Sequence, residues 1–236
     1  MHEIDRDPEG VKRVRASNPS PLTLDGTNTY VVGRWIVDPG PSDRDHVAAV
    51  RAAVDGGIEG VVLTHDHGDH ADAAPLLDAP VFRPGDGESA GPFTAIGTPG
   101  HSSDSVCLIW AQSVCFTGDT VLGAGSVFIA PGEGSLSVYL ESLWRLRALD
   151  LEILAPGHGP YVRDPAGKLD EYIEHRLERE RKLTAALDAG LRTQDELLDA
   201  AWSDAPAELR YFAGLSLASH LEKLSEEGRL PEGVER

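Results

Sequence analysis

The sequence of 236 residues predicts an α/β fold, and two observations carry this prediction. Short apolar runs alternate with segments of helical periodicity over the first two thirds of the chain. Several of these apolar runs end in small residues or Pro-Gly and are followed at once by His or Asp. Strands that deliver such residues from their ends present them at one edge of a sheet, so we expect four segments to converge on one polar site.

The first predicted elements are a hairpin and a helix. The stretches TNTYVVG and RWIVDPGP read as two strands that turn at Gly33-Arg34. Ser42 can cap a helix through DRDHVAAVRAAV, which the following Gly-Gly pair stops. A strand over GVVLT then leads into the stretch LTHDHGDHAD.

The next elements repeat this arrangement. TAIGTPG, SVCFTG and LEILAPG are predicted strands, each followed by His or Asp, and SLSVYLESLWRLRALD between the last two has helical periodicity.

Two cysteines and three histidines are expected to have structural roles only. Cys107 and Cys115 lie in apolar runs and should be reduced, buried and inert. The histidines His2, His46 and His220 are expected to face solvent or to pack with satisfied ring nitrogens.

The chain divides at about Asp164 into a catalytic domain, residues 1–163, and a small domain, residues 164–236. The second part consists of three predicted helices and a short GRLPEG wing, which suggests a helical, winged-helix-like appendage. From Lys168 to Arg236 there are 10 Lys and Arg against 16 Asp and Glu, a net charge of −6. This sign is wrong for a surface that follows a phosphate backbone, so the appendage is expected to pack over the site or to dimerise.

Charge and hydropathy limit the cellular location and the partners that we expect for the protein. No stretch approaches the roughly 18 apolar residues that span a bilayer, and MHEIDRDPEG lacks an apolar leader segment. We therefore expect a cytoplasmic protein with no membrane partner. The net charge of −18 repels polyanions, so no extended DNA binding is expected and an anionic substrate must be attracted locally.

A cluster of histidines and aspartates points to metal chemistry. Imidazole and carboxylate without cysteine suit Zn²⁺, Fe or Mn in an open site better than a closed structural zinc site. The candidates exceed the four ligands of one tetrahedral ion, so two divalent ions are expected, most simply Zn²⁺, with Asp119 as the natural bridging carboxylate. A purely structural set and a non-catalytic metal sensor are the alternatives. The candidate ligands are His65, His67, Asp69, His70, His101, Asp119 and His158.

At these residues the sequence resembles the metallo-β-lactamase superfamily, whose pattern is H-x-H-x-D-H followed by a single His, a single Asp and a final His. Here the pattern is HDHGDH, TPGH, TGD and PGHG. The resemblance implies an αββα sandwich with Asp119 bridging the two ions. The resemblance also makes antibiotic hydrolysis a less favoured activity, because true lactamases commonly carry a cysteine where this chain has Asp119. The implied ligands are His65, His67 and His101 for the first ion and Asp69, His70 and His158 for the second.

A narrower resemblance covers nearly the whole chain. NPSPLTLDGTNTYVV, VDPGP, YIEHRLERE and HLEKLSEEGRL are similar to the beta-lactamase-like protein 2 family. That family implies a C-terminal winged-helix-like domain and, for at least one member, endoribonuclease activity on single-stranded RNA. Only 17 residues separate His101 from Asp119 and 38 separate Asp119 from His158, which excludes the inserted cap domain of β-CASP nucleases.

The expected activity is hydrolysis by a metal-activated hydroxide at neutral pH. Asp69 and Asp119 are the candidate catalytic carboxylates, and Asp69 could orient the hydroxide and accept its proton. The first prediction is a phosphodiesterase that acts on short single-stranded RNA. The alternatives are a glyoxalase II-like thioester hydrolase of a small acyl thioester and a non-enzymatic metal-binding interaction protein. A homodimer is possible in each case.

Four further residues are candidate substrate contacts. Asn28 in GTNTY could line the mouth of the site, although a role in the hairpin is equally consistent with the sequence. Ser126 follows Asp119 closely in a loop of small residues. His175 and Arg176 on the helix that leaves the main domain could reach an anionic group, and a surface ion pair of Arg176 with Glu180 is the alternative.

Overall fold

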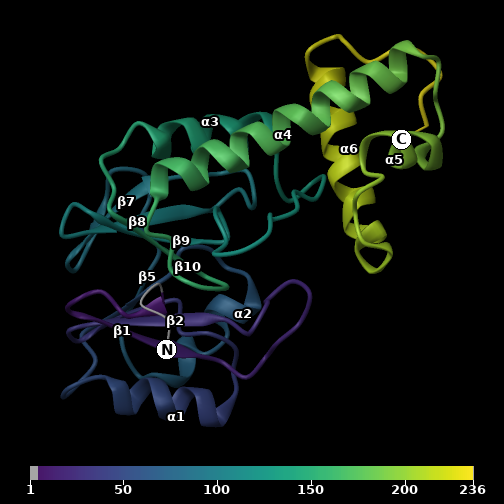
Figure 1. The fold of residues 1–236 in the computed structure, drawn as a ribbon. Helices are drawn as coiled ribbons and strands as arrows, with labels where there is room; N and C mark the ends of the chain where they lie inside the picture. Colours follow the sequence, from purple (N-terminus) through teal and green to yellow (C-terminus); the bar gives the residue numbers. More distant parts are fainter. Residues whose placement is uncertain (1–4, 236) are drawn as a thin grey trace.

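The computed structural model describes residues 5–235 as two five-stranded sheets that pack face to face, with helices on both outer faces (Figure 1). The first sheet has the order β1-β2-β3-β4-β5, in which β1, β2 and β3 are antiparallel and β3, β4 and β5 are parallel. Helix α1 covers its outer face. The elements are β1 Val11–Arg15, β2 Asn28–Val32, β3 Trp35–Val37, α1 Arg44–Ala53, β4 Gly60–Val62 and β5 Val81–Phe82.

The second sheet has the order β10-β9-β8-β7-β6. Only β9 and β10 are parallel, so both deliver the following residues at the same edge. Helices α3 and α4 cover the outer face of this sheet (Figure 1). The elements are β6 Ser89–Ala90, β7 Phe93–Gly97, β8 Val106–Trp110, β9 Val114–Gly118, α3 Leu136–Arg147, β10 Ile153–Pro156 and α4 Pro165–Asp188.

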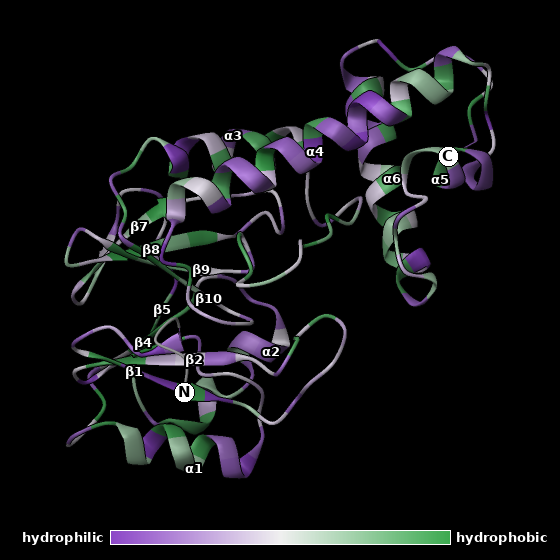
Figure 2. Cartoon of the chain, in the orientation of Figure 1, coloured by the Kyte–Doolittle hydropathy of each residue, from purple (hydrophilic) through white to green (hydrophobic). Residues whose placement is uncertain are grey.

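Alternation along the strands divides the core into layers. Val114 and Phe116 of β9 point into the space between the sheets, whereas Cys115 points toward α3 and α4. In the same way, Tyr30 of β2 points into the space between the sheets, whereas Val31 points toward α1. Because both faces of these strands are covered, they are apolar without a polar stripe, and Figure 2 shows the strands of the second sheet mainly in green.

The elements predicted for residues 5–163 are present, with one correction at a helix start, and the structure adds the strands β1, β5, β6 and β8, which were not predicted. The hairpin of β2 and β3 turns at Gly33, whose φ of 59° suits glycine. Helix α1 is capped by Asp43, whose side chain accepts a hydrogen bond from the backbone N–H of His46, and not by Ser42 as expected. Both residues are good N-caps, and the register of the first turn selects Asp43.

The C-terminal region is helical. Helix α4 begins in the apolar core beside the second sheet with Leu169 and Tyr172 and ends in a second apolar cluster with Leu183 and Leu187. One helix therefore belongs to both parts, and the domain boundary expected at residue 163 lies just before it begins. No strand follows α6 in the part of the chain that the structure describes, so the expected wing is a series of turns. The remaining helices are α5 Gln194–Ala201, the 3₁₀ turn Ala207–Leu209 and α6 Arg210–Glu226.

The residues expected to be structural differ in their surroundings. Cys107 and Cys115 are free and buried, as predicted. His46 is buried with its Nε2 atom 3.0 Å from the Thr29 hydroxyl, but its Nδ1 atom has no hydrogen-bond partner among the described residues, so the expectation is met at one nitrogen only. His220 is also buried, but neither ring nitrogen has a hydrogen-bond partner among the described residues, contrary to the expectation of satisfied nitrogens. His2 lies outside the described residues. No helix between residues 5 and 235 is long and apolar enough to cross a membrane.

Candidate metal centre

Four strand ends and one short helix bring the seven predicted ligands together. His65 and His67 follow β4, and helix α2, Gly68–Ala71, carries the Asp and the His of the same motif. His101 follows β7, Asp119 follows β9 and His158 follows β10. The parallel pairing of β9 with β10 places the last two at the same edge, as the sequence pattern predicted.

The first group of ligand atoms is formed by three histidines. His65, His67 and His101 each offer one nitrogen, and these atoms lie within 4.8 Å of one another. The Nε2 atom of His101 is 3.2 Å from the Nδ1 atom of His67. The Nε2 atom of His65 is buried and has no hydrogen-bond partner among the described residues. An orphaned imidazole nitrogen that faces two other imidazoles is the donor arrangement that Zn²⁺ and related ions bind.

The second group combines one carboxylate with two histidines. Asp69, His70 and His158 also offer atoms within 4.8 Å of one another. The Nε2 atoms of His70 and His158 are 3.3 Å apart, and Oδ2 of Asp69 is 3.3 Å from Nε2 of His158. This mixed set suits a second divalent ion of the same hardness.

Asp119 lies between the two groups. Its Oδ1 atom is 3.3 Å from Nε2 of His70 and 3.3 Å from Nε2 of His158. Its Oδ2 atom is 3.8 Å from Nε2 of His101 in the other group. A carboxylate that presents one oxygen to each group is the geometry of a bridging ligand. The residues present therefore fit a binuclear centre.

Close approach of these side chains requires a glycine before His158. A Cβ atom on Gly157 would overlap Cε1 of His70 and would lie 2.8 Å from Oδ1 of Asp119. Neither atom can move without displacing a predicted ligand. The absence of a side chain at Gly157 therefore allows His70 and Asp119 to approach the end of β10 closely.

The charges of the cluster are mutually stabilising. Burial raises the pKa of the Asp119 carboxyl, but the charges and hydrogen bonds of His70 and His158 outweigh burial and hold that pKa well below its usual range. Burial also raises the pKa of Asp69, and the hydrogen bond from His158 with the charge of His70 lowers it on balance to about 2. Burial and the nearby charge of His70 lower the pKa of His65, which keeps its ring neutral. Metal binds ionised carboxylates and neutral imidazoles, so His70 and His158, whose pKa values burial lowers but the neighbouring carboxylates raise on balance, would each lose a proton when an ion binds.

A residue that the sequence analysis did not single out orients one ligand. The Oδ2 atom of Asp38 is 2.9 Å from Nδ1 of His70 and also accepts a hydrogen bond from the Thr64 hydroxyl, while Oδ1 accepts from the Thr64 backbone N–H. Asp38 is buried, with φ at 48°. A carboxylate on the far nitrogen of a ligand histidine fixes its tautomer and ring orientation. Its position at the end of β3, in VDPGP, is the signal that could have identified it.

A cavity of about 280 Å³ opens beside the ligands. Its walls are largely apolar, and none of the described lining residues is a lysine or arginine. Asp69 forms part of the floor with 31% of its side chain exposed. The lining consists of the ligands His67, Asp69, His101, Asp119 and His158 together with Ser20, Pro21, Leu22, Thr23, Leu122, Ser126, Val127 and Phe128.

The four predicted substrate contacts occupy different positions. Ser126 lines the cavity. His175 and Arg176 lie behind it: Arg176 donates to the Ser126 hydroxyl at 2.9 Å and to the carbonyl of Val127, and Nδ1 of His175 is 3.5 Å from that hydroxyl. No ion pair joins Arg176 to Glu180 among the described residues; that carboxylate binds other cations.

Asn28 is fully buried and has a different role from the expected one. Its amide donates to the carbonyls of Pro156 and Gly159, and its Oδ1 accepts from Arg15. These carbonyls flank His158. Asn28 therefore positions the end of β10 instead of lining the cavity.

Comparisons with known proteins agree with this geometry. The family described as the Metallo-beta-lactamase superfamily matches residues 72–158. The Beta-lactamase-like protein 2 homolog of Caenorhabditis elegans is 30% identical over 97% of this chain and 88% of its own length. The Atrochrysone carboxyl ACP thioesterase of Aspergillus fumigatus is 32% identical over 90% of this chain and 80% of its own. A solved structure of a metallo-beta-lactamase family protein from Thermus thermophilus has a TM-score of 0.74 at 22% identity, covering 93% of this chain and 94% of that one, and supports the fold.

Proposed function

The chain belongs to the metallo-β-lactamase superfamily, and we propose that it hydrolyses an acyl thioester at a centre of two divalent ions, most simply Zn²⁺. The observation that carries the thioester is the lining of the cavity. Leu22, Leu122, Val127 and Phe128 surround the ligands with apolar surface, which suits an acyl group. A relative named as an acyl carrier protein thioesterase supports the same class of bond.

The reaction adds water to the carbonyl carbon and breaks the carbon–sulfur bond, with the proton passing to the departing sulfur. Bound ions would polarise the carbonyl oxygen and bring the pKa of a water molecule to about 7. Asp69 is partly exposed on the cavity floor and stays ionised at neutral pH, since its pKa is about 2. Its carboxylate can accept a hydrogen bond from the attacking water and direct the oxygen lone pair at the substrate.

Phosphodiester hydrolysis in short single-stranded RNA is the second candidate. The exposed ring of Tyr211, 5.4 Å from that of Phe212, favours it because bases stack on such surfaces. The net charge of −18 and a cavity lining without lysine or arginine among the described residues oppose it. The thioester is therefore the better supported substrate.

Turnover assays separate the two candidates. Purified, metal-loaded protein is incubated with acyl thioesters, with release of free thiol as the readout, and in parallel with labelled single-stranded RNA. We expect thiol release that is lost in Asp119→Asn and retained in Asp45→Asn, a matched change on the exposed face of α1. RNA cleavage without thiol release would overturn the thioester proposal.

A further inference from the structure

We propose that Phe128, Phe212 and Tyr211, here called the aromatic wall, form the acyl subsite and select substrates with a planar aromatic acyl group. The proposal rests on the thioesterase function proposed above and names its substrate class. It also gives the C-terminal helical region a direct part in the site, because Phe212 and Tyr211 belong to α6.

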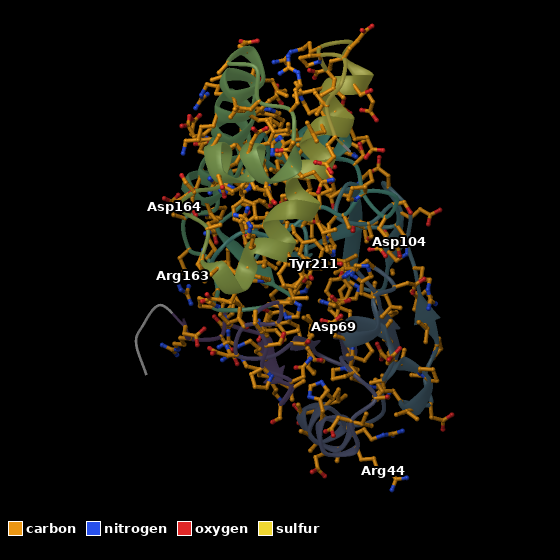
Figure 3. All side chains as sticks on the ribbon, turned by 90° about the vertical axis from the view of Figure 1, so that its right-hand side faces the viewer. Arg44, Asp69, Asp104, Arg163, Asp164 and Tyr211 are labelled. Atoms are coloured by element: carbon orange, nitrogen blue, oxygen red, sulfur yellow. The ribbon has the colours of Figure 1, made fainter. Side chains whose placement is uncertain are left out.

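The wall is a continuous series of rings that begins at the metal centre. The ring centroid of His101 is 6.5 Å from that of Phe128, which lines the cavity. Phe128 is 5.2 Å from Phe212 at an interplanar angle of 40°, and Phe212 is 5.4 Å from Tyr211 at 76°. Figure 3 shows Tyr211 above Asp69 in the view onto this side of the molecule. Aromatic contacts at these separations are favourable, and a planar ligand can extend the series.

Exposure distinguishes this wall from ordinary core packing. Leu22, which lines the cavity, is 41% exposed, and Tyr211, which lies beyond the cavity lining at the far end of the wall, is 73% exposed. Large apolar side chains left in water around a concave site are typical of surfaces that bind a ligand. Since Phe128 and Leu22 belong to loops far apart in the sequence, apolar surface reaches the mouth from more than one segment.

The wall is fixed relative to the reacting centre. The Ser219 hydroxyl of α6 donates to the carbonyl of Ile129 at 2.6 Å, which ties α6 to the loop that carries Phe128. Nδ1 of His101 lies 3.4 Å from the carbonyl of Phe128 itself. Arg176 holds the neighbouring Val127 carbonyl from the other side. An acyl group bound to this wall would therefore be placed at a defined distance from the ligands, as preorganised sites require.

The charges around the wall favour a neutral aromatic group over nucleobases. Arg210, next to Tyr211, is paired with Asp195 and Asp199 at 3.0 Å and 2.8 Å, so two carboxylates offset its positive charge. Binding of single strands combines stacking with a basic groove that follows the backbone. Here the stacking surface is present and no lysine or arginine lines the cavity among the described residues.

The first test compares 2-naphthoyl and acetyl thioesters of the same thiol. We expect wild-type protein to prefer the naphthoyl substrate in kcat/KM, and we expect Tyr211→Ala and Phe212→Leu each to lower that preference by about tenfold. Phe212→Leu keeps an apolar side chain and removes only the ring. Trp144→Ala, which removes a 54% exposed ring on α3 that is not part of the aromatic wall, is the matched control. An unchanged preference in both variants would overturn the proposal.

A binding measurement keeps the proposal separate from the activity. Calorimetry with 2-naphthoate and with acetate, on metal-loaded full-length protein, needs no turnover. Weaker naphthoate binding in both variants supports the aromatic wall even if no thioester is hydrolysed, a result that would defeat only the proposed function. Thioester hydrolysis with equal affinity for naphthoate in wild type and variants would leave the function and reject the wall. Binding of labelled RNA that falls in the variants while naphthoate binding does not would reassign the rings to base stacking.

Discussion

The Nδ1 atom of His70 lies 2.9 Å from Oδ2 of Asp38, and this contact turns the Nε2 atom of His70 toward Oδ1 of Asp119. The end of β3 and helix α2 are thereby connected to Asp119, the predicted bridging carboxylate, at the end of β9. The orientation of a ligand thus depends on a residue outside the ligand set.

Asp38→Asn is expected to weaken metal binding by about 10- to 100-fold. Asparagine tolerates the left-handed backbone at this position, so the turn is kept while the negative partner of His70 is lost. Competition with a chelator measures the affinity. Asp55→Asn, at a side chain that is 91% exposed, is the control. Equal affinity in Asp38→Asn and wild type would show that Asp38 does not orient the ligand.

Gly157→Ala is expected to abolish one of the two metal sites, because the new methyl group would displace His70 or Asp119. Elemental analysis of the purified variant should find about one ion fewer per chain than in wild type. Gly214→Ala is the control: nothing lies within 4 Å of its Cβ, and the change should stabilise α6 by about 0.5–1 kcal/mol. Full occupancy in Gly157→Ala would contradict the tight fit.

His220→Phe is expected to raise the free energy of unfolding by about 1–3 kcal/mol. Both ring nitrogens of His220 are buried without hydrogen-bond partners among the described residues, whereas the ring packs edge-on to Trp202 at 5.5 Å. Phenylalanine keeps that ring contact and removes the unpaired nitrogens. Denaturant unfolding measures the difference, and a variant less stable than wild type would show that the ring nitrogens of His220 make stabilising interactions in the folded protein.

The stability of the wild type should fall below pH 6.5, and His220 should contribute to this fall. Burial and the charges of Arg176 and Lys223 hold the pKa of His220 well below its ordinary value of 6.5. The unfolded chain then binds a proton that the folded chain does not, so its contribution to stability is present above pH 6.5 and lost as the pH decreases. The slope from this residue approaches about 1.4 kcal/mol per pH unit. Unfolding of His220→Phe should be less acid-sensitive, and identical slopes would contradict this assignment.

Local patterns in the sequence were sufficient for β2, β3, β4, β7, β9 and β10, whereas β1, β5, β6 and β8 were not predicted. The assignment of the seven clustered side chains as metal ligands stays a prediction. The turn at Gly33, the strand before Asp119 and the helix after Asp164 each follow from residues within a few positions. The convergence of His101 and His158 with the HDHGDH motif follows because strands end at a common edge.

Features that depend on tertiary contacts could not be predicted. The contact of Phe128 with Phe212 joins a loop of the catalytic part to α6, and nothing local to either residue indicates it. The burial of Asn28 depends on the carbonyls around His158, which only the folded chain brings near. Neighbouring Ser42 and Asp43 are both suitable helix caps, and only the helix register decides between them.

The most direct test of the site is the number of divalent ions bound per chain. Full-length protein is loaded with Zn²⁺, passed over a desalting column and analysed for zinc and protein, with Asp119→Asn measured in parallel. A bridging Asp119 between two groups of ligands predicts two ions per chain in wild type and fewer in the variant. One ion or none in wild type, or two in Asp119→Asn with unchanged affinity, would contradict the bridged binuclear centre.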